Sequence, residues 1–229
     1  YEPAGEEFYT DIVCPMYPSL ERLEEFAKQG SERPMIMIEY AHAMGNSIGI
    51  LNDYWQIIDR NSNLQGGFIW EWMDHALELV NNRGQKFWGY GKDYHPDKPS
   101  DGNFMNDGLV APNRIPHPHM SEVKKVYQPV RFHSKDIATG HFEIENRYDF
   151  ISLEHLDIHY QISVDGHVFA TGSLGSMAIS PAERYSIHIP LDEIEFQHNK
   201  EYLLTLSAVT KNDIPLIGIG YELAWDQFN

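Results

Sequence analysis

The chain has 229 residues, a length that predicts two domains at about 150 residues per domain. Hydrophobic residues make up 42% of it and aromatic residues 13%, which suffices for a packed core and excludes a disordered chain. Its 17 basic residues against 34 acidic ones leave a formal net charge of -17, so nucleic acid and acidic membrane surfaces are poor partners.

Cysteine usage and the first residues say little about where the protein works. Cys14 is the single cysteine, so no internal disulfide can form, and its apolar neighbours favour an inert core thiol. No apolar run is as long as a membrane span, and the acidic residues 1–7 do not resemble a signal peptide. We expect a soluble chain without a membrane partner, and the sequence leaves its compartment open between cytoplasm and periplasm.

The first half alternates short apolar runs with amphipathic helices. Residues 11–17, 34–38 and 67–72 are apolar runs typical of buried strands. Between them, Ser19 is a helix cap followed by apolar residues at helical spacing, and a second helical pattern covers residues 51–58. This alternation of strand and helix predicts three parallel βαβ units.

The chain then becomes irregular and afterwards changes its period. Residues 81–118 are rich in Gly, Pro, Asn and Asp, as in a long functional loop, and a short helix ends at Pro129. Beyond it apolar and polar residues alternate, and Asp165-Gly166 suits a tight hairpin turn. About seven short strands predict a β-sandwich, so we expect domains at residues 1–128 and 129–229. The strands expected are 142–144, 156–164, 168–170, 185–189, 202–209 and 217–223.

A cluster of polar and small residues follows directly on one buried strand. Glu39 comes after four apolar residues, and in parallel α/β barrels the catalytic groups sit at the carboxyl ends of strands. Because an unpaired carboxylate is costly to bury, Glu39 is either catalytic or paired structurally, and spacing alone leaves both open. Tyr17 and Trp70 come near the ends of the neighbouring strands, so all three are expected around one mouth.

With His42, this set of side chains suits carbohydrate, because sugar C–H faces rest on aromatic rings while hydroxyls need donors and acceptors. The plainer alternatives are a structural hydrogen bond for His42 and a barrel-core position for Trp70. Strand alternation turns Glu71 away from Trp70, so it is expected to be ion-paired or supporting rather than the catalytic acid. His117-Pro118-His119 lacks a third spaced ligand and indicates a rigid turn more than a metal site.

The segment Ile38-Glu39-Tyr40-Ala41-His42-Ala43-Met44-Gly45-Asn46-Ser47 resembles a motif of the large bacterial β-galactosidases of glycoside hydrolase family 2. Similar stretches are 11–17, 64–74, 106–110 and 114–118, so the resemblance covers nearly all of residues 9–128. It implies an α/β plus all-β chain. The first part would be the last three βα units of a (β/α)₈ TIM barrel, and the second an immunoglobulin-like β-sandwich.

The resemblance implies a retaining hydrolase that removes terminal β-D-galactose through a covalent glycosyl-enzyme. Glu39 matches the family's nucleophile, and Tyr17, His42 and Trp70 match residues that line its galactose pocket. The β-galactoside substrate is therefore the expected small-molecule partner.

Phe104, through its carbonyl, and Asp107 match positions that bind sodium in the family, where the best-known member has Asn in place of Asp107. An Asx-turn before Gly108 is the structural alternative for Asp107. The family's magnesium site is expected in the full-length enzyme, through residues outside this chain.

A retaining glycosidase needs two carboxyl groups about 5 to 5.5 Å apart. The family's acid/base belongs to an Asn-Glu pair, and this sequence has no such dipeptide. We therefore expect part of a longer enzyme that is inactive alone, needs the remainder of the same enzyme, and forms a homo-oligomer at full length. The alternative, from another class, is a non-catalytic carbohydrate-binding or assembly module.

Overall fold

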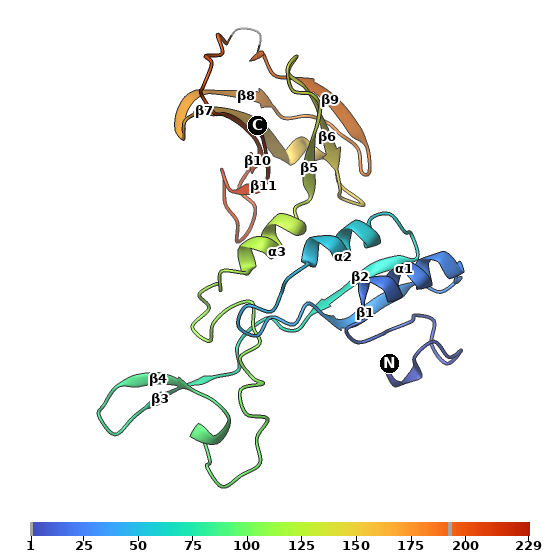
Figure 1. Cartoon of the computed structure of the whole chain (residues 1–229), viewed down its shortest axis with the longest axis vertical. Helices are drawn as coiled ribbons and strands as arrows, with labels where there is room; N and C mark the ends of the chain where they lie inside the picture. Colours follow the sequence, from blue (N-terminus) through green and yellow to red (C-terminus); the bar gives the residue numbers. More distant parts are fainter. Residues whose placement is uncertain (1, 192–193) are drawn as a thin grey trace. The chain divides into compact units, whose positions relative to one another are not determined.

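The computed structural model describes residues 2–191 and 194–229, and the chain divides into two units, Tyr1–Val126 and Tyr127–Asn229 (Figure 1). Unit 1 contains η1 (Glu2–Ala4), α1 (Leu20–Gln29), β1 (Met35–Tyr40), α2 (Leu51–Ile58), β2 (Leu64–Ile69), β3 (Leu77–Val80), β4 (Lys86–Gly89), η2 (Gly91–Asp93) and α3 (Met120–Val126). Unit 2 contains β5 (Val130–Asp136), β6 (His141–Asn146), η3 (Leu153–His155), β7 (Leu156–Val164), β8 (His167–Gly175), β9 (Arg184–His188), β10 (Tyr202–Thr210) and β11 (Glu222–Phe228). Among these described residues, no helix has the length and apolar character needed to cross a bilayer.

Strand β1 is bonded along both of its edges. On one edge it pairs in parallel with β2. On the other edge the N–H groups of Ile36 and Ile38 donate to the carbonyls of Val13 and Pro15, both at 3.0 Å. The strand expected at residues 11–17 is reduced to isolated parallel bridges, because Pro15 has no N–H with which to continue the ladder.

Three helices pack with this pairing around one apolar cluster. The Ser19 side chain caps α1 by accepting a hydrogen bond from the Arg22 N–H at 3.2 Å, and Gly30 ends the helix with a φ of 68°. Helix α2 contacts both α1 and α3, and Figure 1 shows the helices beside β1 and β2. Tyr40, the last residue of β1, is fully buried and accepts a hydrogen bond from Trp55 Nε1 at 3.0 Å. The residue beside Glu39 is thus fixed in the core.

The segment expected to be irregular, residues 81–118, takes part in an antiparallel hairpin. Strand β4 of this segment pairs with β3. Asn81 Oδ1 closes the turn by accepting hydrogen bonds from the N–H groups of Arg83 at 2.9 Å and Gln85 at 3.0 Å. A composition rich in Asn and Gly indicates turns, but it does not reveal strands that are only four residues long.

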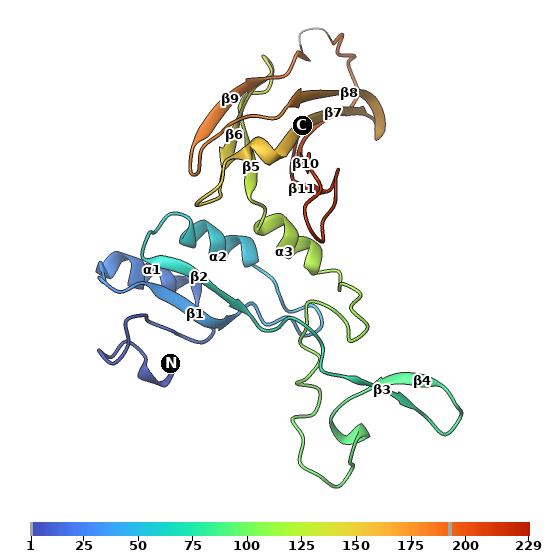
Figure 2. The same ribbon diagram turned by 180° about the vertical axis from the view of Figure 1, so that it is seen from behind.

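Unit 2 is a sandwich-like pair of antiparallel sheets with a shared core. One sheet has the strand order β11-β10-β7-β8 and the other β5-β6-β9, and Figures 1 and 2 show them facing each other. Phe142 of β6 and Leu206 of β10 belong to one buried cluster. Asp226 of β11 accepts a hydrogen bond from the Phe132 N–H of β5 at 2.8 Å, so a carboxylate also joins the two sheets.

The described part of unit 2 has the seven strands that the sequence spacing predicts, although not all at the expected places. Asp165 and Gly166 have φ values of 49° and 79°, so the tight turn between β7 and β8 is formed as predicted. Strand β11 begins only at Glu222, because Gly218 and Gly220 adopt left-handed backbone with φ values of 80° and 76°. Strand β5 was not expected.

The core of unit 2 yields a stability prediction. Phe142 is 1% exposed and its ring centroid lies 5.0 Å from that of Phe228. We expect Phe142→Ala to lower the free energy of unfolding of unit 2 by about 3 to 5 kcal/mol, because it removes buried ring area and leaves a cavity. Amide exchange of β6 and β10, measured on the whole chain, reports the opening of this unit alone.

The matched control for this substitution is Phe150→Ala, because the Phe150 side chain is 92% exposed. It should change the free energy of unfolding by less than about 0.5 kcal/mol. Similar losses for the two variants would contradict the burial of Phe142.

Candidate active site

Parallel pairing brings three of the expected site residues to one end of unit 1. Tyr17 ends the segment that bonds β1, and its N–H donates to the Glu39 carbonyl at 2.9 Å. Glu39 is the penultimate residue of β1. Trp70 follows directly on β2, and its N–H donates to the Tyr40 carbonyl at 3.2 Å. The carboxyl ends of three neighbouring parallel segments therefore meet, as at the mouth of a parallel barrel.

Tyr17 and Glu39 are also joined through their side chains. The Tyr17 phenol faces the Glu39 carboxylate, and a hydrogen bond between the two is among the causes that raise the pKa of Tyr17. Partial burial raises the pKa of Tyr17 well above its usual value, and the hydrogen bond and negative charge of Glu39 raise it further, together with the charges of Asp107 and Glu71. The phenol thus keeps its proton through neutral pH and acts as a hydrogen-bond donor to Glu39.

Asp107 places a third carboxylate in this cluster. It is 2% exposed, and its Oδ2 accepts a hydrogen bond from Trp70 Nε1 at 3.3 Å and lies 3.5 Å from His42 Nε2. Its Oδ1 is buried and has no hydrogen-bond partner among the residues that the structure describes. A buried carboxylate oxygen of this kind is costly to leave alone, so the site suits a cation or a donor group at this point.

The Asx-turn alternative for Asp107 is not formed. Such a turn would use the N–H two residues on, that of Leu109, which donates instead to the Glu71 carbonyl at 2.8 Å. The neighbouring Gly108 N–H donates to Asp74 Oδ1, also at 2.8 Å. The Asp107 side chain is therefore left to face Trp70.

Aromatic contacts hold His42 in the same group. Its ring centroid lies 6.0 Å from that of Tyr17 and 6.0 Å from that of Phe104. The Ser47 hydroxyl donates a hydrogen bond to the His42 carbonyl, which ties the loop after β1 back on itself. His42 thus has one nitrogen facing Asp107 and its ring between two aromatic neighbours.

Glu71 lies next to the cluster and is ion-paired, as its position predicts. Its Oε2 is 3.1 Å from His75 Nε2. Burial raises the pKa of Glu71, the positive charge of His75 lowers it, and the charges of Asp107 and Asp74 raise it. Glu71 therefore adds negative charge around Tyr17.

The His117-Pro118-His119 segment belongs to a second polar cluster. His117 Nε2 lies 2.8 Å from Asp74 Oδ2, and His119 Nε2 lies 3.2 Å from the Gly108 carbonyl oxygen. A pocket of about 330 Å³ opens beside these residues. Local sequence patterns contain no specific sign of the role of Asp74, since its partners His117 and Gly108 are far along the chain. Within residues 2–191 and 194–229, no three His, Cys, Asp or Glu side chains gather as metal ligands.

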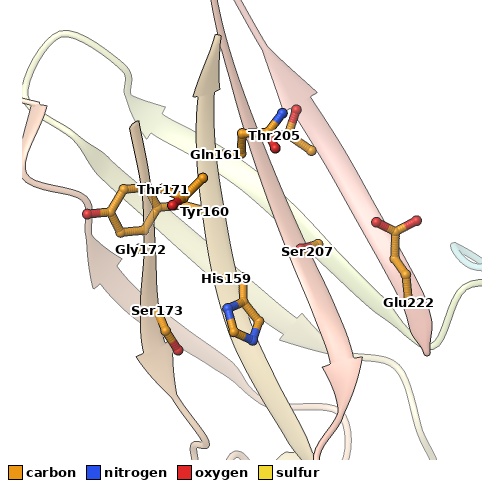
Figure 3. A pocket seen from close by; sticks show the side chains of 9 residues that line it. All are labelled: His159, Tyr160, Gln161, Thr171, Gly172, Ser173, Thr205, Ser207 and Glu222. Carbon is orange, nitrogen blue, oxygen red and sulfur yellow. The ribbon is translucent and has the colours of Figure 1, made fainter. Parts of the chain in front are cut away.

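Unit 2 has a hollow of its own on the outer face of its four-stranded sheet (Figure 3). Its volume is about 520 Å³. Neutral polar side chains and one carboxylate dominate the lining, which consists of His159, Tyr160, Gln161, Thr171, Gly172, Ser173, Thr205, Ser207 and Glu222. The ring of Tyr160 packs toward the core and lies over Gly172, where a Cβ would be 2.3 Å from the ring.

Unit 1 has parallel strands that end in carboxylates and aromatic rings, and unit 2 has antiparallel sheets. Comparison of the sequence with known families assigns this combination to a class of enzyme. Residues 3–132 match the family model described as glycosyl hydrolases family 2, TIM barrel domain. Residues 142–229 match the model described as β-galactosidase, domain 4. The chain belongs to glycosyl hydrolase family 2.

Its curated relatives include β-galactosidases. That of Priestia megaterium is 37% identical over 220 residues, which cover 96% of this chain and 21% of that enzyme. That of Klebsiella pneumoniae strain 342 is 33% identical over 241 residues, which cover 100% of this chain and 23% of that enzyme. The chain thus spans between a fifth and a quarter of the length of these relatives.

Among solved structures, a Bacteroides uniformis β-glucuronidase matches 96% of this chain and 26% of its own at 16% identity and a TM-score of 0.33.

The contact between Tyr17 and Glu39 yields a titration prediction. We expect Glu39→Gln to lower the pKa of Tyr17 toward the usual tyrosine value, because the substitution removes the negative charge that disfavours the phenolate. The Tyr17 resonance in carbon-13 spectra of ring-labelled tyrosine, assigned with Tyr17→Phe, reports the midpoint. Tyr54 is the internal control, since burial and Glu21 raise its pKa. A Tyr17 midpoint that does not move would contradict the contact.

Proposed function

We propose that this chain is the carboxyl-terminal part of the catalytic barrel of a retaining β-galactosidase, followed by its immunoglobulin-like sandwich. Residues 1–128 would supply the last three βα units and residues 129–229 the sandwich. The family matches and the β-galactosidase relatives support this proposal. The single observation that carries it is the Glu39 carboxylate at the carboxyl end of β1, where the Tyr17 N–H donates to the Glu39 carbonyl at 2.9 Å.

In the proposed reaction Glu39 is the nucleophile. Its carboxylate forms an ester with the anomeric carbon of terminal β-D-galactose while the bond to the aglycone oxygen breaks. That oxygen takes a proton from a carboxylic acid supplied by the rest of the enzyme. The same acid, now a base, removes a proton from water, which displaces Glu39 and releases galactose with its configuration retained. Tyr17 orients the Glu39 carboxylate through its hydrogen bond.

The neighbouring side chains would hold the sugar. Trp70 is 38% exposed, so part of its indole is available to rest against the C–H face of galactose. His42 and Asp107 can exchange hydrogen bonds with the sugar hydroxyls. Binding energy from these groups would fix the anomeric carbon in front of Glu39.

Asp107 and the Phe104 carbonyl would hold a sodium ion. The buried Asp107 Oδ1, which has no hydrogen-bond partner in the described part of the chain, fits a hard cation that prefers oxygen ligands. When bound, the ion supplies a positive charge, and a sugar hydroxyl oxygen can coordinate to it. A magnesium ion would be held by residues elsewhere in the enzyme, which we propose to be a homo-oligomer.

A second candidate function is carbohydrate binding by unit 2 without catalysis. The polar hollow of Figure 3 favours it, because hydroxyl, amide and imidazole groups line one face of the sheet. The aromatic ring among its lining residues packs toward the core, however, so the hollow offers less of a stacking surface than Trp70 does. Galactose binding by residues 127–229 alone would favour this hypothesis of non-catalytic carbohydrate binding.

The role of Glu39 can be tested in the full-length enzyme. Glu39→Ala should lower turnover by about 10⁴-fold or more, because the activated nucleophile is lost while the remaining site is intact. Added azide should restore turnover of an aryl galactoside with a good leaving group and give α-galactosyl azide, because azide attacks from the side that Glu39 occupied. The matched control is the exposed Glu32, whose change to Ala should leave turnover unaffected. A loss below tenfold for Glu39→Ala would mean a structural role.

The proposed sodium site gives a separate prediction. Replacing sodium by a bulky organic cation should raise KM for galactosides in the parent enzyme but hardly in Asp107→Ala, because that variant has already lost the carboxylate ligand. Asp107→Asn keeps one oxygen in place and should retain much of the sodium response. Equal responses of KM in the parent enzyme and in Asp107→Ala would exclude Asp107 as a sodium ligand.

A further inference from the structure

Two consecutive peptide groups next to Asp107 are each hydrogen-bonded at both ends. In the peptide that joins Asp107 to Gly108, the carbonyl accepts from the Glu71 N–H at 2.8 Å and the N–H donates to Asp74 Oδ1 at 2.8 Å. In the next peptide, the Gly108 carbonyl lies 3.2 Å from His119 Nε2, and the following N–H donates to the Glu71 carbonyl at 2.8 Å. These four bonds fix the backbone on the carboxyl side of Asp107.

Half of this support comes from side chains. Asp74 uses one carboxylate oxygen for the Gly108 N–H and turns the other toward His117 Nε2 at 2.8 Å. Because a carboxylate oxygen and a carbonyl oxygen only accept, the Nε2 atoms of His117 and His119 act as the donors. We call Asp74, His117 and His119 the Gly108 clamp. Asp74 is 8% exposed, so its carboxylate depends on the Gly108 N–H and His117 rather than on water.

The backbone of Met73 and Asp74 leaves no room for a side chain at Gly108. A Cβ there would lie 2.2 Å from the Asp74 backbone nitrogen and 2.5 Å from the Met73 carbonyl carbon. The two backbone segments therefore approach as closely as glycine permits. His117 is tied to the same segment by its backbone, since its N–H donates to the Leu109 carbonyl at 3.0 Å.

We propose that the Gly108 clamp positions the Asp107 carboxylate for galactose binding, with His117 acting through Asp74 as a positioning residue. This inference rests on the proposed function. Asp107 is one bond from the clamped peptide, and its Oδ2 must meet Trp70 Nε1 at 3.3 Å and His42 Nε2 at 3.5 Å. Without His117 the Asp74 carboxylate is free to rotate, the Gly108 N–H loses its acceptor, and Asp107 shifts away from Trp70.

The test uses His117→Ala in the full-length enzyme. The backbone bond of residue 117 to Leu109 does not need the imidazole, so the local fold remains. KM for galactosides should rise about tenfold while kcat changes less than about threefold, because Asp107 contributes to binding in ground and transition states alike. The dissociation constant of a non-hydrolysable thiogalactoside, measured by calorimetry, should rise by the same factor. An unchanged dissociation constant would overturn the proposal.

Two further variants separate positioning from general destabilisation. His117→Gln places an amide N–H within reach of Asp74 and should restore thiogalactoside binding to within about threefold of the parent. His133→Ala is the matched control, because His133 pairs with Glu145 at 2.6 Å and its side chain is 34% exposed, as is that of His117. Its loss should leave the dissociation constant unchanged. A rise equal to that of His117→Ala would overturn the proposal.

A double-mutant cycle then tests the route through Asp107. If His117 acts through Asp107, adding His117→Ala to Asp107→Ala should raise the dissociation constant by less than about twofold, because the positioned group is already gone. Effects that multiply would overturn the proposal. The Glu39→Ala variant separates failure of the clamp proposal from failure of the proposed function. If Glu39→Ala loses turnover but His117→Ala binds the thiogalactoside normally, only the clamp proposal is refuted.

Discussion

Hydrogen bonds along both edges of β1 determine where the side chains of the candidate site lie. A strand that is bonded on two sides is fixed in register, because a slip by one residue would turn its core residues outward. If β1 slipped by one residue, the fully buried ring of Tyr40 would have to leave the core, which would cost free energy of folding. With β1 fixed, the bond from the Tyr17 N–H to the Glu39 carbonyl and that from the Trp70 N–H to the Tyr40 carbonyl place the site residues together.

The same geometry gathers negative charge at one place. Glu39, Asp107 and Glu71 all raise the pKa of the Tyr17 phenol, so their fields overlap there. Such a cluster is unfavourable for folding, because like charges in a partly buried site repel. It suits glycoside cleavage, where positive charge develops on the sugar ring in the transition state and is stabilised by fixed negative groups. Under the proposed function, this cost in folding stability would favour catalysis.

Local rules predicted the parts of the fold that local chemistry determines. Ser19 caps its helix and the Asp165-Gly166 pair makes its turn, because each needs only its immediate neighbours. Strand lengths were less predictable. Pro15 interrupts one expected strand, while β3, β4 and β5 are strands whose apolar alternation is too short to be seen.

In the candidate site too, some residues can be predicted from the sequence and others cannot. Residues at the carboxyl ends of buried strands, such as Glu39 and Trp70, are found from position alone. The partners of Asp74 are not, because the Gly108 N–H lies 34 residues further on and His117 lies 43 residues further on. Contacts of that span depend on how the loops close, which single-sequence periodicity does not encode.

The hairpin of β3 and β4 has a consequence for the continuity of the chain. Its turn residues Asn81 to Gln85 are exposed, and none of its residues belongs to the buried part of either apolar cluster. A nick or an inserted peptide at this turn would therefore leave both cores whole. The hairpin is the natural point at which to open the polypeptide, or to attach a label, without taking apart the strands that carry Glu39.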